Sequence, residues 1–209
     1  MVRTWVADVV PLTDETIYQS YYDALPEWRK DKTDRCKYKA DKMLSVAAWS
    51  LWEYAKGQEK NLPENTVYNL SHSGNYVMCA YSDKKEKKVG CDIEKLGKNH
   101  LQMAKHFFCE AEYSCIAEAK SEGVSRQLFY RYWVLKESFM KATRQGMALG
   151  IDTFEIGWDN GQPVLVKKPE IYPETYYYKE YTGGNIAAKM AVCTTDVEID
   201  EALHHHRFV

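Results

Sequence analysis

Hydrophobic positions along the chain repeat with two different periods, and their order predicts two similar halves. Between residues 34 and 56, apolar side chains recur every three or four positions, which predicts a long helix with one packed face. Shorter apolar stretches at 67–70, 76–82 and 88–94 predict a strand meander. A second helix is predicted at 124–144, followed by strand candidates at 153–157, 163–166, 175–181 and 187–193. We therefore expect an α+β fold made of a pseudo-twofold pair of halves, each a long helix packed on a small antiparallel sheet.

The repeated order places a boundary close to residue 96. We expect residues 1–96 to form the N-terminal half and residues 97–203 to form the C-terminal half. Residues 204–209 contain three adjacent histidines, His204, His205 and His206, and we expect them to form a disordered tail.

Composition and charge exclude several classes of function. Hydrophobic residues make up 45% of the 209 residues and charged residues 28%, as in ordinary globular proteins. The net charge of −2 argues against a broad electrostatic surface for nucleic acid or an anionic membrane. No apolar run is long enough to cross a bilayer and no signal-peptide pattern is present, so we expect a cytoplasmic protein. The six cysteines lack CxxC spacing and are expected to be reduced thiols.

Candidate chemistry begins in the segment Val89-Gly90-Cys91-Asp92-Ile93-Glu94. Side chains on a strand alternate between faces, so Asp92 and Glu94 share one face beside Gly90. Two carboxylates roughly 7 Å apart on one face repel each other unless a cation lies between them. This segment therefore predicts a cation site.

The helix predicted at 124–144 supplies a candidate third carboxylate, Glu137. One arc of the helix carries Trp133, Lys136, Glu137, Met140, Lys141 and Arg144. A solvated face with charge pairs such as Glu137 to Lys141 is one interpretation. A substrate wall with a carboxylate and two lysines is the other, and it also accounts for the tryptophan and the methionine.

Two further segments are candidates for binding phosphate. His72 lies between small hydroxyl residues in the loop predicted at 69–74, where its ring and backbone N–H groups can contact a phosphate. Taken alone, this motif favours a hydrogen-bonded turn histidine. Basic residues at 29–39 are interspersed with aspartates and mostly resemble a solvated face, of which one or two residues are candidates to hold a terminal phosphate.

Taken in order, these motifs resemble the surfactin-synthetase-activating type of 4′-phosphopantetheinyl transferase. The resemblance rests on Asn69-Leu70-Ser71-His72-Ser73, on Val89 to Glu94, and on Trp133-x-x-Lys136-Glu137-Ser138-Phe139-x-Lys141, with a matching segment at 105–113. It extends over nearly the whole chain. It implies two α/β halves with the active site between them, and a monomer. It also implies coenzyme A as the donor and a serine of an apo carrier protein as the acceptor.

The resemblance also implies roles for individual residues. By position, Asp92, Glu94 and Glu137 resemble the Mg²⁺ ligands, and Glu137 also resembles the base that takes the serine proton. Lys141 resembles the residue that neutralises charge on the phosphates. The residues that resemble contacts to coenzyme A are Arg29, Lys32, Ser45, Ser71, His72 and Lys136. Residues 95–120 correspond to the surface for the carrier, with Leu101, Met103 and Phe107 as apolar contacts.

One departure from the family pattern concerns the distal end of coenzyme A. The family usually has a Gly-Lys-Pro segment before the Asn-x-Ser-His motif, and residues 58–67 lack it. This departure motivates one alternative, a catalytically degenerate module that binds carrier proteins. A Mg²⁺-dependent nuclease is disfavoured because the charge balance provides no broad basic groove. The half-length, trimeric acyl-carrier synthase type is disfavoured by chain length and by the motifs of the second half.

Overall fold

The structure is a computed structural model that describes residues 1–183 and 186–209. Its α-helices are α1 (Glu15–Asp23), α2 (Glu27–Asp34), α3 (Lys39–Gly57), α4 (Leu101–Phe107), α5 (Glu110–Ala117) and α6 (Glu122–Ala142). Its strands are β1 (Val2–Asp8), β2 (Val67–Ser73), β3 (Tyr76–Ser82), β4 (Val89–Lys95), β5 (Glu155–Asp159), β6 (Gln162–Lys167), β7 (Tyr177–Tyr181), β8 (Ala188–Thr194) and β9 (Ile199–Arg207). Short 3-10 helices span Val10–Thr13 and Gly146–Leu149.

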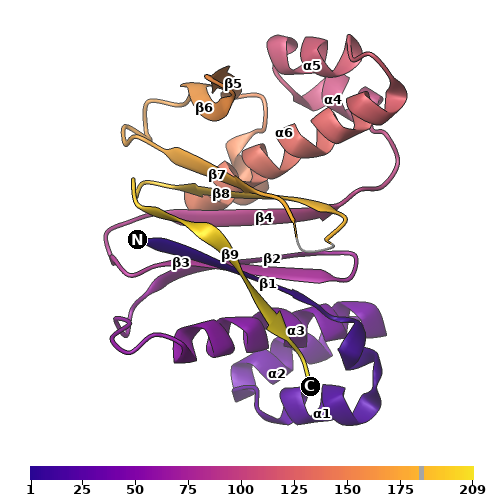
Figure 1. Cartoon of the computed structure of the whole chain (residues 1–209), viewed down its shortest axis with the longest axis vertical. Helices are drawn as coiled ribbons and strands as arrows, with labels where there is room; N and C mark the ends of the chain where they lie inside the picture. The colour runs from indigo at the N-terminus through magenta and orange to yellow at the C-terminus, as the bar shows by residue number, and fades with distance from the viewer. Residues whose placement is uncertain (184–185) are drawn as a thin grey trace.

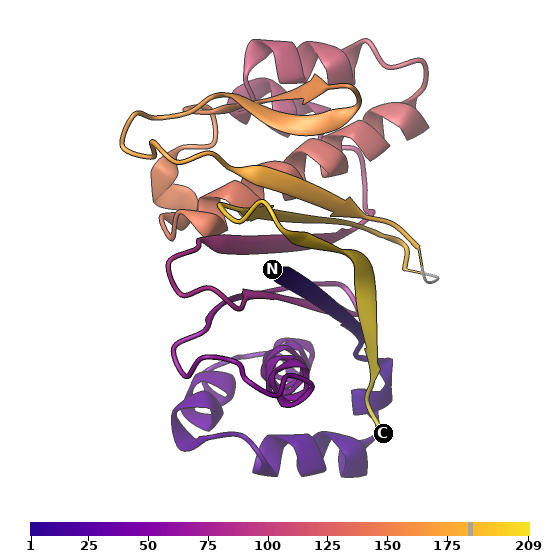
Figure 2. The same ribbon diagram turned by 60° about the vertical axis from the view of Figure 1, so that its left-hand side comes forward.

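These elements stack in layers, which confirms the predicted α+β class (Figure 1). Helix α3 packs on a four-stranded sheet of order β2-β3-β1-β9, with α1 and α2 outside it (Figure 2). Helix α6 packs on a three-stranded sheet of order β4-β8-β7, with α4 and α5 outside it. The hairpin of β5 and β6 packs beside α5 and α6. The two sheets face each other in the middle of the molecule.

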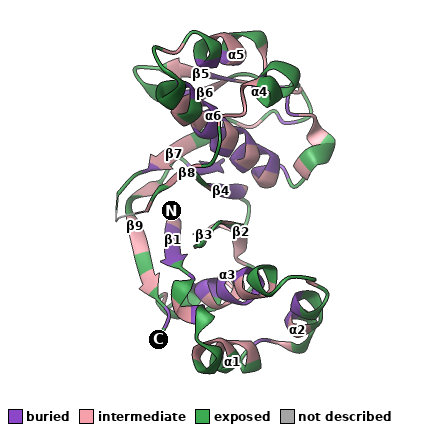
Figure 3. Ribbon diagram, turned by 90° about the vertical axis from the view of Figure 1, so that its right-hand side faces the viewer, coloured by how far each residue is buried: buried purple, intermediate pink, exposed green. Residues whose placement is uncertain are grey.

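Three apolar clusters fill the spaces between these layers. Helix α3 contributes Leu44, Ala47, Ala48 and Leu51 to the cluster beneath the first sheet, and α6 contributes Val134, Leu135 and Phe139 to the cluster above the second. A third cluster lies between the sheets and includes Val6, Met78, Cys91 and Val192. The buried positions of α3 and α6 stand out against the exposed outer helix α1 (Figure 3).

Each of the two larger sheets contains one strand from the other predicted half. Strand β4 lies within residues 1–96 but pairs antiparallel with β8, with Asp92 opposite Ala191. Strand β9 begins within residues 97–203 but pairs in parallel with β1. A division after residue 96 therefore separates the sequence without separating the sheets. The pseudo-twofold relation between the halves stays a prediction.

The last residues of the chain form a strand, so the prediction of a disordered tail over 204–209 is wrong. His204 stacks on Trp5 of β1, with 4.9 Å between the ring centroids. His205 is exposed, whereas the side chain of Phe208 is only 1% exposed. The segment is ordered because it pairs in parallel with β1 and packs against it, although its composition alone suggested a solvated tail.

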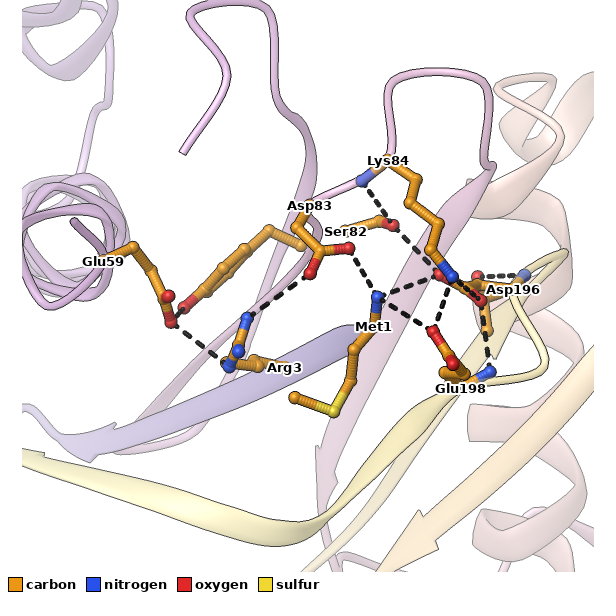
Figure 4. A network of polar contacts seen from close by, with 10 residues as sticks. Met1, Arg3, Glu59, Ser82, Asp83, Lys84, Asp196 and Glu198 are labelled. Carbon is orange, nitrogen blue, oxygen red and sulfur yellow. Dashed lines mark hydrogen bonds and ion pairs between the residues drawn. The ribbon is translucent and has the colours of Figure 1, made fainter. Parts of the chain in front are cut away.

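A polar network ties the start of β1 to the connections that flank β4 and β9 (Figure 4). The amino group of Met1 lies 2.5 Å from Asp83 Oδ1 and 3.2 Å from Asp196 Oδ2. Lys84 Nζ bridges Asp196 and Glu198 at 3.1 and 2.6 Å. Asp196 is 1% exposed, so these cations compensate a buried carboxylate.

Within the described ranges, no helix is both long enough and apolar enough to cross a membrane.

Candidate active site

Helix α6 lies directly against Gly90 of β4. A Cβ atom at this position would overlap the carbonyl oxygen of Ser138 and the backbone nitrogen of Ala142. Glycine therefore permits the backbones of the strand and the helix to approach each other. The face of β4 that carries Gly90 also carries Asp92 and Glu94, next to the last turns of α6. The opposite face fills the core between the sheets with Val89, Cys91 and Ile93, as the alternation predicts.

Asp92 is the most buried carboxylate of this region, with 2% of its surface exposed. Its Oδ1 atom accepts hydrogen bonds from Lys141 Nζ at 2.6 Å and from the hydroxyl of Ser71 at 2.7 Å. Its Oδ2 atom is buried and has no hydrogen-bond partner among the described residues. Burial raises the pKa of Asp92, and the charge and hydrogen bond of Lys141 oppose this effect. One oxygen of Asp92 is thus satisfied while the other remains available.

Glu94 and Glu137 are half-buried carboxylates that share the electrostatic environment of Asp92. Burial raises the pKa of Glu94, a hydrogen bond from Ser73 at 2.6 Å opposes this effect, and the negative charge of Asp92 adds to it. Burial and then the charge of Asp92 likewise raise the pKa of Glu137, which Lys141 partly offsets. The three carboxylates therefore repel one another at the junction of β4 and α6, and Lys141 supplies the positive charge that opposes this repulsion.

The donor set of this junction fits a hard divalent cation. Three carboxylates of raised pKa and one orphaned buried oxygen, Asp92 Oδ2, provide the oxygen ligands that Mg²⁺ prefers. In the part of the chain that the structure describes, no three acidic, histidine or cysteine side chains already converge in a ligating arrangement. The side chains of Glu94 and Glu137 would therefore have to close around a cation, with the buried Asp92 as the fixed member.

The segment Asn69 to Ser73 lies within β2, and only Gly74 and Asn75 form the turn that follows. Ser71 is buried, and its single hydroxyl hydrogen points to Asp92 Oδ1. His72 is exposed on the other side of the strand. Partial desolvation of the ring and then the charge of Lys141 lower the pKa of His72. The side chain of His72 is thus open to solvent, whereas the hydroxyl of Ser71 is committed within the protein.

Two of the predicted contacts to coenzyme A point into the protein instead of into the site. Arg29 is 6% exposed, and its Nη2 atom donates to the carbonyl oxygen of Ser45 at 3.0 Å. The hydroxyl of Ser45 lies 2.8 Å from Thr33 Oγ1 in the same buried contact. Lys32, in contrast, is exposed on α2. The prediction that Arg29 and Ser45 bind a phosphate is thus corrected to a contact that fastens α2 to α3.

Lys136 is also turned away from the site. Its side chain is fully buried, and its Nζ atom donates to both oxygens of Glu112 and to the carbonyl oxygen of Phe154 at 2.7–2.8 Å. Adjacent residues of a helix point about 100° apart, so Lys136 enters the core while Glu137 faces β4. The predicted wall of Glu137 with two lysines therefore contains only one of them, Lys141.

Three residues that border the site were given no individual role from the sequence. Asn69 and Ser73 flank Ser71 at spacing two on β2 and contact β4. Arg144 follows the end of α6 with a positive φ of 62° and donates from Nη2 to the carbonyl oxygen of Tyr68 at 2.7 Å. The alternation of Asn69, Ser71 and Ser73 was the available signal for the first two, and Arg144 was indicated only by its place on the polar arc of the predicted helix.

An apolar hollow of about 190 Å³ opens beside Glu94 and is lined by His100, Met103, Phe129, Tyr130 and Trp133. Helix α4 forms one wall of this hollow and carries two exposed apolar side chains, of which Met103 also lines the hollow. Met103 is 36% exposed and Phe107 is 51% exposed. Glu94 therefore adjoins an apolar surface to which α4 contributes.

Comparisons with known proteins agree on one family. Residues 88–194 match the sequence model described as the 4′-phosphopantetheinyl transferase superfamily. The 4′-phosphopantetheinyl transferase Sfp of Bacillus subtilis (strain 168) is 34% identical over 165 residues, which are 79% of this chain and 70% of that protein. The 4′-phosphopantetheinyl transferase gsp of Aneurinibacillus migulanus is 34% identical over 117 residues, 56% of this chain and 48% of that protein.

A more distant relative is the L-aminoadipate-semialdehyde dehydrogenase-phosphopantetheinyl transferase of Xenopus laevis. It is 30% identical over 115 residues, which are 52% of this chain and 36% of that protein. Among solved structures, the holo-[acyl-carrier-protein] synthase of Thermotoga maritima is similar with a TM-score of 0.42 and 19% identity. The similarity covers 51% of this chain and 61% of that chain.

Proposed function

The chain belongs to the 4′-phosphopantetheinyl transferase superfamily, as an enzyme of the same class as Sfp, and we propose that it transfers 4′-phosphopantetheine from coenzyme A to a serine of an apo carrier protein. The observation that carries this proposal is the arrangement around Asp92. The buried carboxylate of Asp92 accepts a hydrogen bond from Lys141, its other oxygen has no partner among the described residues, and its charge acts on two further carboxylates of the family motifs.

In the proposed site, Asp92, Glu94 and Glu137 hold a Mg²⁺ ion. The ion would supply positive charge to the pyrophosphate of coenzyme A and would relieve the repulsion among the carboxylates. Asp92 Oδ2 supports this assignment because it is a buried acceptor without a partner among the described residues. One chain contributes all three carboxylates, so the proposed working unit is a monomer, and the proposed compartment is the cytoplasm.

Glu137 is the proposed general base. The serine oxygen of the carrier attacks the β-phosphorus of coenzyme A, and the bond from that phosphorus to the oxygen bridging to the α-phosphate breaks. Glu137 takes the serine proton, and adenosine 3′,5′-bisphosphate leaves. In the metal-free protein, burial and the charge of Asp92 raise the pKa of Glu137, which favours proton uptake by this carboxylate.

Lys141 is the proposed contact to the phosphates. A lysine ammonium has three N–H donors. Two of them are directed to Asp92 Oδ1 and to Ser71 Oγ, at 2.6 and 3.0 Å. The side chain of Lys141 is 26% exposed, so the third donor can reach a phosphate oxygen while the other two keep the ammonium in place. The ring of His72 and the exposed Lys32 are the remaining proposed contacts along coenzyme A.

The carrier protein is proposed to dock on α4. Met103 and Phe107 are exposed apolar side chains on this helix, close to the hollow beside Glu94. An apolar patch around the carrier serine would cover them and would bring the serine to the carboxylates. The apolar hollow would accommodate the pantetheine arm.

A transfer assay tests the proposal. The chain is incubated with Mg²⁺, coenzyme A and a panel of apo carriers from fatty-acid, polyketide and peptide synthesis, and mass spectrometry detects the added phosphopantetheine. Glu137→Gln should reduce the rate by roughly 10²- to 10⁴-fold, the usual contribution of a general base. Glu122→Gln, at an exposed position in the first turn of the same helix, is the control and should retain the wild-type rate. Full activity of Glu137→Gln would reject the assignment of the base.

Calorimetry separates the enzyme from a degenerate carrier-binding module. The enzyme should bind coenzyme A more tightly with Mg²⁺ than without it. A module that only binds carriers would show carrier binding and no Mg²⁺-dependent binding of coenzyme A.

A further inference from the structure

Among the described residues, one edge of strand β4 forms no backbone hydrogen bonds with another strand. The strand pairs with β8 on one side, while among the residues that the structure describes no backbone ladder joins it to β2 on the other. Cys91 and Ile93 are completely buried, so their N–H groups on this edge cannot turn to bulk water. Buried backbone donors are almost always paired, and the partners of these donors need to be identified.

The partners are three polar side chains of β2. Cys91 N donates to Asn69 Oδ1 at 2.9 Å, Ile93 N to Ser71 Oγ at 3.4 Å, and Lys95 N to Ser73 Oγ at 3.1 Å. Every pair is separated by 22 residues, so the two strands run parallel in constant register. We call these three contacts the seam between β2 and β4. The alternation Asn-x-Ser-x-Ser therefore matches the period of a strand and joins the two sheets.

Two of the three side chains in the seam, Ser71 and Ser73, also donate a hydrogen bond to a carboxylate of β4. The hydroxyl of Ser71 donates to Asp92 Oδ1, and the hydroxyl of Ser73 donates to Glu94 Oε2 at 2.6 Å. A serine hydroxyl has one hydrogen, so each of these donations is its only one. In Ser73 the same oxygen accepts from the backbone of Lys95. The backbone of β4 thus fixes the position of the oxygen, and the oxygen fixes the carboxylate of Glu94.

We propose that Ser73 is a positioning residue that orients the carboxylate of Glu94 for the divalent cation. The proposal rests on the proposed function, because it concerns the same cation site. Asp92 accepts hydrogen bonds from both Ser71 and Lys141. The carboxylate of Glu94 accepts one among the described residues, from Ser73, and is therefore the less constrained of the two proposed ligands on β4. Groups that hydrogen-bond to metal ligands typically contribute 10- to 100-fold to metal affinity.

The seam contains its own matched control. Asn69 accepts the N–H of Cys91 as Ser73 accepts that of Lys95, but its side chain contacts neither Asp92 nor Glu94 in the described residues. Asn69→Ala therefore removes one contact of the seam without removing a carboxylate partner. Ser73→Thr keeps the hydroxyl, and threonine is well accommodated in strands.

The test is the binding of Mn²⁺ to the full chain, followed by electron paramagnetic resonance with and without coenzyme A. Ser73→Ala should weaken Mn²⁺ binding by about 10- to 100-fold. Ser73→Thr should restore the wild-type affinity, and Asn69→Ala should retain it while lowering the melting temperature. Transfer activity of the wild type is measured in parallel.

Three results would overturn the proposal. Mn²⁺ affinity of Ser73→Ala equal to wild type would show that Glu94 needs no orientation, and an equal loss in Asn69→Ala would show that the seam acts only through strand spacing. A failure of Ser73→Thr to restore binding would exclude the hydroxyl as the cause. Absence of Mn²⁺ binding and of transfer in the wild type would reject the proposed function itself, and the positioning role with it.

Discussion

Lys136 Nζ lies 2.7 Å from Glu112 Oε1, and neither side chain has any exposed surface. The carboxylate of Glu112 also accepts the N–H groups of Cys109 and Ile156. It therefore joins α6 to the start of α5 and to β5. This contact fixes the rotation of α6 and, with it, the direction in which the neighbouring Glu137 points.

Loss of Lys136 should destabilise the fold severely. Lys136→Met leaves the carboxylate of Glu112 buried without its cation, which typically costs about 3–5 kcal/mol in the free energy of unfolding. Urea unfolding followed by circular dichroism measures this loss. Lys120→Met, at an exposed position, is the control. The double variant Glu112→Gln with Lys136→Met should recover part of the stability, and an additive loss in the double variant would argue against the coupling.

Gly90→Ala should force α6 away from β4. The new methyl group would overlap backbone atoms of Ser138 and Ala142, which cannot move independently of the helix. We expect a loss of about 3 kcal/mol in the free energy of unfolding, the upper range for overpacking. Gly57→Ala is the matched control because no heavy atom lies within 4 Å of its added Cβ. Equal stability of the two variants would contradict the close approach of α6.

Lys141→Met should make the stability of the protein depend on Mg²⁺. In the wild type the ammonium group of Lys141 partly neutralises Asp92, so a divalent cation relieves less carboxylate repulsion there than in the variant. The variant should lose about 2 kcal/mol, the contribution of a charged hydrogen bond. Mg²⁺ should then raise its melting temperature more than that of the wild type.

A double variant identifies where the cation acts in Lys141→Met. Addition of Asp92→Asn removes the charge that needs compensation, so the response of the melting temperature to Mg²⁺ should disappear. Identical responses in the wild type, the single variant and the double variant would place the cation elsewhere.

The docking of β9 should weaken in acid because of His206. The centroid of the His206 ring lies 4.0 Å from that of the Tyr54 ring, and the Nε2 atom of His206 lacks a hydrogen-bond partner in the described residues. Burial lowers the pKa of this histidine. The unfolded chain therefore binds a proton more readily than the folded chain. The stability that neutral His206 contributes is present at high pH and is lost as the pH falls below the unfolded pKa of about 6.5, by at most about 1.4 kcal/mol per pH unit.

Two histidine variants check this pH dependence. His206→Phe keeps the ring and removes the titration, so its melting temperature should change less than that of the wild type between about pH 7.5 and about pH 5. His205→Gln alters an exposed position on the same strand and should behave as the wild type. A pH dependence of His206→Phe equal to that of the wild type would contradict the prediction.

The sequence by itself determined the local structure and the acidic part of the site. Apolar periodicity predicted α3, α6 and most strands, because the face that a residue occupies within one element depends on its spacing alone. The same alternation placed Asp92 and Glu94 on one face of β4, where Gly90 allows α6 to approach. These features require no knowledge of distant partners.

Only the tertiary structure decided which face of each element meets which partner. Lys136 appeared beside Glu137 on one arc, but α6 is packed against β4 and β8 as well as against α5, so the arc is divided between the site and the core. Arg29 donates to the carbonyl oxygen of Ser45, and the histidines of β9 are ordered by β1, which precedes them by about 200 residues. Such contacts arise from the packing of segments far apart in sequence, and local spacing carries no information about them.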